Sequence, residues 1–247
     1  MAGHSQFKNI MHRKGRQDKV RSKLFGKLAR EITVSAKMGL PDPAFNPRLR
    51  AAIIAARAEN MPKDNIERAV KKSQGGEAES YDEMRYEGYG PGGVAIMVQV
   101  LTDNKNRAVS EIRHAFTKNH GNLGEAGSVG YLFSKKGLII VDKSKASEDK
   151  LTEIALDAGA EDLSDEGDTW EVLTDPKEYD AVLAAIKASG ITPEHSEVTM
   201  IASTYQKLEG TQATAMMRLL ETLEDLDDTQ NVYTNFDMDE AAVAAAG

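Results

Sequence analysis

The sequence of 247 residues contains no cysteine and no apolar run that reaches the ~18 residues of a membrane-spanning helix. Without cysteine the chain has no disulfide bond, no thiolate metal ligand and no cysteine nucleophile, which suits a reducing compartment. The amino terminus is basic, but no apolar stretch follows it as in a secretory signal. We therefore expect a cytoplasmic protein with no membrane partner.

Patterns typical of catalysis and metal binding are equally scarce. No G-x-S-x-G arrangement is present, and the five histidines lack metal-ligand spacing such as H-E-x-x-H. The acidic run at 221–228 lacks the mid-loop glycine and the closing glutamate of a calcium loop. We predict a solvated acidic helix end there, with a docking site for a basic partner as the alternative. The sequence thus predicts no catalytic residue, no metal, no cofactor and no small-molecule substrate, and hence not an enzyme.

Three glycines, Gly88, Gly90 and Gly93, formally match the G-x-G-x-x-G pattern of dinucleotide-binding loops. In such loops a strand leads through the turn into a helix, whose N-terminus meets the pyrophosphate. Here the strand-like run VAIMVQV follows, and Pro91 lies inside the turn. We therefore predict a tight connection between two strands, with close approach of an RNA backbone as an open alternative.

Charge is distributed very unevenly along the chain, whose overall net charge is −8. Residues 1–76 hold 17 Lys and Arg against 6 Asp and Glu, a net charge of +11. Residues 77–247 hold 14 against 33, a net charge of −19. A basic segment on an acidic body predicts an anionic partner for one end of the chain.

The positive charge is densest between Lys8 and Arg30, with nine Lys and Arg and a single acid, Asp18. Residues 1–15 show no helical period, and we predict a flexible basic arm. From residue 16 to residue 38 the period is helical, and one face collects the cations within roughly 80°: Arg16, Lys19, Lys23, Lys27 and Arg30. The opposite face is apolar and predicts a core contact: Leu24, Phe25, Leu28, Ala29, Ile32 and Ala36.

Two more short helices are predicted before residue 76. Asn46 and Pro47 are a typical cap and first position for the second helix. The break at Asn60-Met61-Pro62 separates it from a third helix, which ends before Gly75-Gly76. Residues 16–76 therefore predict a small all-α domain.

From residue 77 onward the hydrophobic period changes to two, and the fold class predicted is α+β multidomain. Residues 137–202 follow the order β-α-β-β-α-β of a ferredoxin-like split βαβ domain. Before them we expect strands at 84–90, 94–103 and 128–137 with a helix at 104–119, and after them a helix at 211–228 and a strand at 231–237. We predict that the flanking segments form one discontinuous α/β domain (77–136 plus 203–238) into which 137–202 is inserted, followed by a disordered tail at 239–247.

Several long sequence blocks occur in one order along nearly the whole chain: MAGHS, HRKG, REITVSAK, DPAFNPRLR, NMPKDNIERAVKK, YEGYGPGG, LTDNKNRAVSEIRHAF, GSVGYLF and LEDLDDTQNVYTNFD. This order resembles the YebC/PmpR family of probable transcriptional regulatory proteins, whose mitochondrial relatives activate translation of cytochrome oxidase subunits. The resemblance implies one helical and two α/β domains, no catalytic residue and no cofactor. It also implies DNA binding at promoters or, alternatively, association with ribosomes that aids synthesis of proline-rich stretches. The threonine usual in the family after the helix phenylalanine is Gly26 here.

Together, charge and resemblance predict a transcriptional regulator that binds DNA through its basic arm and helical domain. The alternative is a translation factor that binds ribosomal RNA with the same surface. Phosphate binding requires several cations that follow a backbone and release counterions. The predicted nucleic-acid contacts are Lys8, His12, Arg13, Lys14, Arg16, Lys19, Arg21, Lys23, Lys27, Arg30, Arg48 and Arg50. For Arg48 and Arg50, an ion pair within the helical domain is an equally good interpretation.

Overall fold

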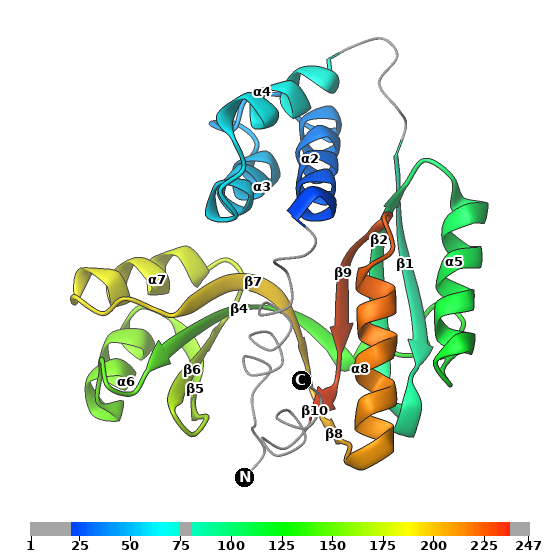
Figure 1. The fold of residues 1–247 in the computed structure, drawn as a ribbon. Coiled ribbons are helices and arrows are strands. Elements are labelled where there is room, and N and C mark those ends of the chain that lie inside the picture. Colours follow the sequence, from blue (N-terminus) through cyan, green and yellow to red (C-terminus); the bar gives the residue numbers. More distant parts are fainter. Residues whose placement is uncertain (1–20, 75–80, 238–247) are drawn as a thin grey trace. The chain divides into compact units, whose positions relative to one another are not determined.

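The computed structural model describes residues 21–74 and 81–237 (Figure 1). Its fold is mixed α/β, with two four-stranded sheets among the described residues. The described chain divides into two compact units, one with residues 129–213 and 233–237, the other with 21–74, 81–128 and 214–232. Among the helices that the structure describes, none combines the length and apolar character needed to cross a membrane.

Three short helices begin the second of these units: α2 (Arg21–Met38), α3 (Pro47–Ala58) and α4 (Lys63–Lys72). The predicted cap of α3 is confirmed, because the Asn46 side chain accepts a hydrogen bond of 3.0 Å from the Leu49 amide and Pro47 is the first helical residue. Ile32 of α2, Leu49 of α3 and Ile66 of α4 meet in a buried cluster. This cluster holds the three helices together.

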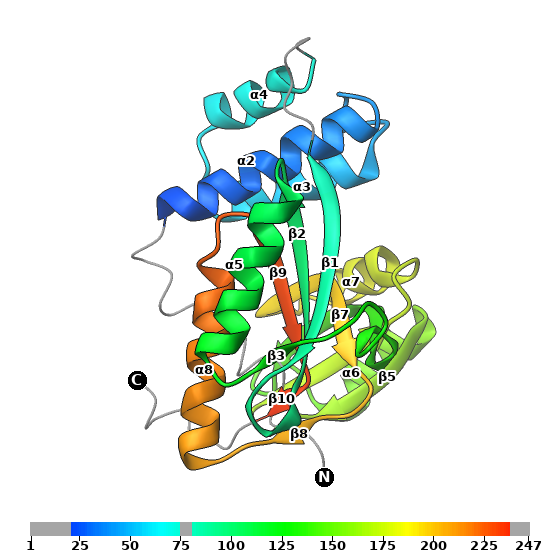
Figure 2. The ribbon, with the colours of Figure 1, turned by 90° about the vertical axis from the view of Figure 1, so that its right-hand side faces the viewer.

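A sheet of order β3-β1-β2-β9 completes the same unit. Its strands are β1 (Asp82–Tyr89), β2 (Ala95–Thr102), β3 (Asn122–Leu123) and β9 (Thr229–Thr234). Two helices, α5 (Lys105–Lys118) and α8 (Gly210–Glu224), cover one face of it, as Figure 2 shows. Phe116 of α5 and Leu219 of α8 are both fully buried there. Segments more than 100 residues apart in sequence therefore share this core.

The glycine pattern at 88–93 begins in β1 and continues through a 3-10 turn (Pro91–Gly93) towards β2, and the two strands pair as antiparallel neighbours. A Cβ atom at Gly88 would lie 2.6 Å from the Asn122 carbonyl oxygen, and one at Gly90 would lie 2.6 Å from the Met216 sulfur. Gly93 has a φ of +79°, a conformation that favours glycine. These glycines serve strand packing and a turn, and a strand rather than a helix follows, as predicted.

The other unit is built on a sheet of order β5-β6-β4-β7. Its elements are β4 (Phe133–Asp142), α6 (Glu148–Asp157), β5 (Ala160–Asp165), β6 (Thr169–Thr174), α7 (Tyr179–Ala188) and β7 (His195–Ala202). Trp170, Ile139 and Leu151 belong to its buried core. A short parallel pair, β8 (Gln206–Lys207) and β10 (Phe236–Asp237), belongs to the same unit.

The strand expected at 128–137 is not formed as predicted. Residues 130–132 make a 3-10 turn, and β4 is one continuous strand from Phe133 to Asp142. Its first residues pair with β7 in the second sheet, with Phe133 opposite Ala202. The described strand that pairs with β1 on this side is instead the two-residue β3, which lies between the helix predicted at 104–119 and the strand predicted at 128–137. A strand this short is too brief to show a hydrophobic period.

Candidate nucleic-acid interface

The twelve predicted contacts fall into three groups. Six lie outside the described residues: Lys8, His12, Arg13, Lys14, Arg16 and Lys19. Arg21 is the first residue of α2. The remaining five are described in full, three on α2 and two on α3: Lys23, Lys27, Arg30, Arg48 and Arg50.

Helix α2 is two-faced, as its sequence period predicts. Ile32 and Ala36 are buried in the helical core, and Phe25, Leu28 and Ala29 are packed against that core. Lys23, Lys27 and Arg30 follow one another at intervals of four and three residues and so share one face of the helix. The apolar face thereby fixes the direction in which the three cations point.

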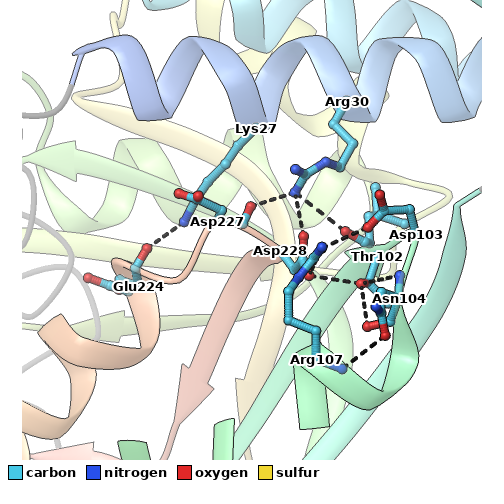
Figure 3. Close-up of polar contacts among 10 residues, drawn as sticks. Lys27, Arg30, Thr102, Asp103, Asn104, Arg107, Glu224, Asp227 and Asp228 are labelled. Atoms are coloured by element: carbon cyan, nitrogen blue, oxygen red, sulfur yellow. Dashed lines mark hydrogen bonds and ion pairs between the residues drawn. The ribbon is translucent and has the colours of Figure 1, made fainter. Parts of the chain in front are cut away.

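The cations of α2 meet the end of α8 and the turn that follows it, and Figure 3 shows Lys27 and Arg30 in these contacts. The Lys23 ammonium donates to the carbonyl oxygen of Asp225 over 3.1 Å. Lys27 donates to the carbonyl oxygen of Glu224. We call Lys23, Lys27 and Arg30, together with the carbonyl and carboxylate oxygens that they contact, the α2–α8 contact.

Arg30 completes this contact with several acceptors. Its Nη1 donates to the Asp227 carbonyl oxygen over 2.5 Å and lies 3.4 Å from the Leu101 carbonyl oxygen. The same nitrogen is 3.4 Å from Asp228 Oδ1. Its guanidinium also lies over the ring of Tyr81, 5.4 Å from the centroid. Arg30 is therefore held by four different groups.

The physical reason for the contacts of Lys23 and Lys27 is the end of helix α8, whereas Arg30 binds the Asp227 carbonyl in the turn that follows. The last carbonyl groups of an α-helix have no partner within the helix and carry the negative end of its dipole. Lys and Arg side chains satisfy such groups and neutralise the partial charge. Three residues that the charge pattern assigned to phosphate contacts thus bind carbonyl oxygens of the same chain in this structure.

The position of Lys27 disfavours the charged form of its side chain. Its pKa is lowered from 10.5 to about 8, mainly because burial disfavours the charged ammonium. The nearby carboxylate of Asp225 acts in the opposite direction, and the neighbouring charge of Lys23 adds to the lowering. The ammonium group of Lys27 is thus partly withdrawn from water.

Asp228 is the centre of the contact and was not recognised from the sequence. Its side chain is buried, with the residue 3% exposed, and Oδ2 accepts hydrogen bonds from Thr102 Oγ1 (2.8 Å) and Arg107 Nη2 (2.7 Å). Hydrogen bonding to Asp228 raises the pKa of the Arg107 guanidinium. The solvated acidic helix end that was predicted is therefore wrong for Asp228, although Asp225 and Asp227 are exposed. A single buried aspartate in an acidic run has no sequence signature that distinguishes it from its neighbours.

The two arginines of α3 are engaged within the same unit. Arg48 Nε lies 2.7 Å from Glu31 Oε1, and its Nη1 lies 2.9 Å from Glu83 Oε2. The hydrogen bond to Glu31 is the main reason why the pKa of Arg48 is raised. Arg50 Nη1 donates to the Pro43 carbonyl oxygen over 3.0 Å. Of the two interpretations offered for Arg48, the structure forms the ion pair.

Other cations of the helical segment remain at the surface. Exposed lysines and arginines lie on α2, α3 and α4: Lys37, Arg57, Lys63, Arg68, Lys71 and Lys72. Lys63 pairs with Glu67 one turn later on α4, at 3.4 Å. Within the described ranges, no group of three or more His, Asp or Glu side chains is arranged to hold a metal ion. The candidate site therefore presents lysine and arginine side chains on three helices.

Comparison with known proteins identifies relatives along the whole chain. Residues 5–76 match the family model of the TACO1/YebC protein N-terminal domain, and residues 81–236 match that of the TACO1/YebC second and third domain. A protein of Acidobacterium capsulatum named "Probable transcriptional regulatory protein" is 58% identical over 99% of this chain and 100% of its own length. A relative from Koribacter versatilis, also named a probable transcriptional regulatory protein, is 56% identical over 98% of this chain and 97% of its own.

A solved structure agrees with these matches. The crystal structure of a conserved hypothetical protein from Aquifex aeolicus is 44% identical and superimposes with a TM-score of 0.78. The alignment covers 92% of this chain and 94% of that one. Sequence and fold therefore point to the same set of relatives.

Proposed function

Because the chain belongs to the TACO1/YebC family, whose relatives are named as transcriptional regulatory proteins, we propose that it is a nucleic-acid-binding regulator. It binds DNA through the basic arm (1–15) and the helical domain (16–76), and acts in the cytoplasm as a transcriptional regulator. It is a binding protein and not an enzyme.

The observation that carries this proposal is the separation of charge. The first 76 residues have a net charge of +11, and the rest of the chain has a net charge of −19. Nucleic acid binds cations with release of counterions, while an acidic body repels the same partner. The partner is therefore directed to the amino-terminal part of the chain.

The α2–α8 contact separates the predicted contact residues into those that already bind groups of this chain and those that precede the contact in sequence. Lys23, Lys27 and Arg30 already donate to carbonyl oxygens, so phosphate oxygens would have to replace these acceptors. The cations between Lys8 and Arg21 precede the contact in sequence, and we assign the first phosphate contacts to them. Arg48 and Arg50 are secondary, because each is already hydrogen-bonded.

A second candidate is a translation factor that binds ribosomal RNA. The observation that favours it is the chemistry of the contact set, which is almost entirely Lys and Arg. Such side chains bind phosphates and position a protein, but do not by themselves read a DNA sequence. Folded RNA offers a fixed shape that a set of phosphate contacts can select.

The proposal includes the domain division. The helical domain binds the nucleic acid. The inserted domain (137–202) interrupts a discontinuous α/β domain (77–136 plus 203–238). Because β4 starts at Phe133 and pairs with β7, the insertion would begin about four residues earlier than residue 137. The tail at 239–247 and the arm at 1–15 lie outside the described residues.

Charge reversal at the end of the arm and the start of the helical domain tests the function. We expect the triple variant Lys14→Glu, Arg16→Glu, Lys19→Glu to weaken binding to DNA or RNA. The slope of log K against log salt should become shallower by about 0.7–0.9 for each lost phosphate contact. A matched control is the triple variant Lys150→Glu, Lys177→Glu, Lys187→Glu, which changes net charge equally at exposed positions of the other unit. Equal slopes for the two variants would remove Lys14, Arg16 and Lys19 from the binding surface.

Crosslinking in cells followed by sequencing then identifies the target. Enrichment of promoter DNA supports transcriptional regulation. Enrichment of one region of ribosomal RNA instead supports the translation factor and contradicts the DNA proposal.

A further inference from the structure

A cavity of about 360 Å³ lies in the helical part of the second unit, between α2 and α4 and beside Tyr81. The apolar part of its lining includes Ala29 of α2, Met61 just before α4, and Ala69 of α4. Met61 and Ala69 are 5% and 6% exposed, so this lining is continuous with the helical core. Its volume falls in the range of small-ligand sites, roughly 300–1,000 Å³.

The charged residues known to line the cavity are cations. Arg30, Arg68 and Lys72 border it, and among the residues that the structure describes no carboxylate belongs to its lining. Arg68 and Lys72 are four residues apart on α4 and therefore stand on one face, and both are exposed. The cavity thus combines a small apolar patch with a larger polar and cationic border, which suits a ligand with a small flat part and a negative charge.

Two further features favour a nucleotide. Phe25 and Tyr81 add aromatic surface, and Asn65 adds an amide that can both donate and accept hydrogen bonds. Proteins that bind single strands combine cations along the backbone with aromatic surface for unstacked bases. Arg30 is already fixed by the Asp227 carbonyl and by Tyr81, so its charge is supplied without ordering a free side chain.

We propose that this cavity binds one unstacked nucleotide of a single-stranded nucleic acid. The base lies over Ala29, Met61 and Ala69, and its phosphate contacts Arg68 and Lys72. The inference rests on the proposed nucleic-acid function and makes it more specific, because a duplex keeps its bases stacked and cannot insert one without unpairing it. The cavity therefore selects single strands, loops and bulges over duplex DNA, and within the proposed function it favours the second candidate, which binds RNA.

Gly26 provides a variant that fills the cavity without disturbing the fold. It lines the cavity from the middle of α2, and a Cβ atom there would have no other atom within 4 Å. Leucine and alanine both have a higher helix propensity than glycine. Gly26→Leu therefore places a side chain in the cavity, while Gly26→Ala is the matched control that changes the helix in the same way and leaves the cavity open.

The test measures binding of fluorescein-labelled probes to the full chain. The probes are a 12-nucleotide oligouridine, the same strand with abasic central positions, and a 12-base-pair DNA duplex. We expect Gly26→Leu to weaken oligouridine binding about tenfold relative to Gly26→Ala, and the abasic strand to bind wild type about tenfold more weakly than oligouridine. The duplex should bind both variants equally.

Equal affinity of the two variants for oligouridine would overturn the proposal, as would equal affinity of wild type for the abasic strand. These outcomes differ from failure of the general function. If the protein does not bind nucleic acid, none of the three probes binds wild type with salt dependence. If only the cavity assignment is wrong, wild type binds the probes with a steep salt slope and Gly26→Leu has no effect.

Discussion

Replacement of Asp228 by asparagine removes one charge from the centre of the α2–α8 contact and leaves the side-chain shape unchanged. In wild type its carboxylate accepts from Thr102 and Arg107 and lies 3.4 Å from Arg30. An asparagine amide has one oxygen and one NH₂ group. In Asp228→Asn the NH₂ group, itself a donor, therefore faces at least one of the donors of Thr102, Arg107 and Arg30. It cannot accept a hydrogen bond from that donor.

The magnitude follows from burial. A hydrogen bond to a charged group contributes about 1.5–3 kcal/mol, and breaking a buried ion pair costs roughly 3–5 kcal/mol. The Asp228 side chain is 5% exposed, but that of Arg107 is 44% exposed, so water compensates part of the loss at Arg107. We therefore expect a loss of roughly 2–4 kcal/mol, or about 5–15 °C in the melting temperature of this unit.

The single tryptophan allows the assay to separate the two units. Trp170 is buried in the core of the unit that contains β4–β7, whereas Asp228 belongs to the other unit. Circular dichroism follows helix loss in the whole chain, while fluorescence of Trp170 follows its own unit. In Asp228→Asn we expect the melting transition seen by circular dichroism to gain an early component and the fluorescence transition to stay in place.

Asp227→Asn is the matched control, because Asp227 is exposed and contributes its backbone carbonyl to Arg30. Exposed substitutions of this kind change stability by about 0.5 kcal/mol or less. If Asp228→Asn melts like Asp227→Asn, the buried carboxylate does not stabilise the contact. If instead the fluorescence transition shifts as far as the dichroism transition, the two units do not unfold independently.

Two pH-dependent predictions follow from shifted pKa values. The pKa of Lys27 is lowered to about 8 in the folded chain. Between about pH 8 and 10.5 the unfolded chain therefore binds more protons at this residue than the folded chain does, so the free energy of unfolding should rise with pH in this window. Lys27→Met should remove that rise in urea titrations followed by circular dichroism, and an unchanged pH profile would contradict the burial argument. The pKa of Glu171 is raised to about 7 by burial and by the nearby charges of Glu166 and Asp162, so stability of its unit should fall as pH rises from about 4.5 to 7. Glu171→Gln should abolish this fall and raise the urea midpoint seen by Trp170 fluorescence at pH 7.5. A midpoint lower than that of wild type at this pH would show that the buried carboxylate does not destabilise the unit.

Local patterns predicted most of the elements that carry the candidate site. The 3.6-residue period of α2, the Asn46-Pro47 start of α3 and the switch to a period of two after residue 77 each depend on neighbours in sequence. The order of elements between residues 137 and 202 was likewise predicted, since each strand and helix there is long enough to show its period. Prediction was wrong at the two-residue β3 and at the junction in β4, where no period is complete.

The sequence by itself determined that Lys23, Lys27 and Arg30 lie on one face of a helix, opposite a core face, because helical geometry is local. Only the tertiary structure decided what that face contacts. The acceptor of Lys27 is a carbonyl oxygen 197 residues away. Every residue carries such a carbonyl, so no amino-acid type marks the ones that a helix end leaves unpaired and a distant cation satisfies. The burial of Asp228 was decided in the same way, by strands and helices that meet only when the chain is folded.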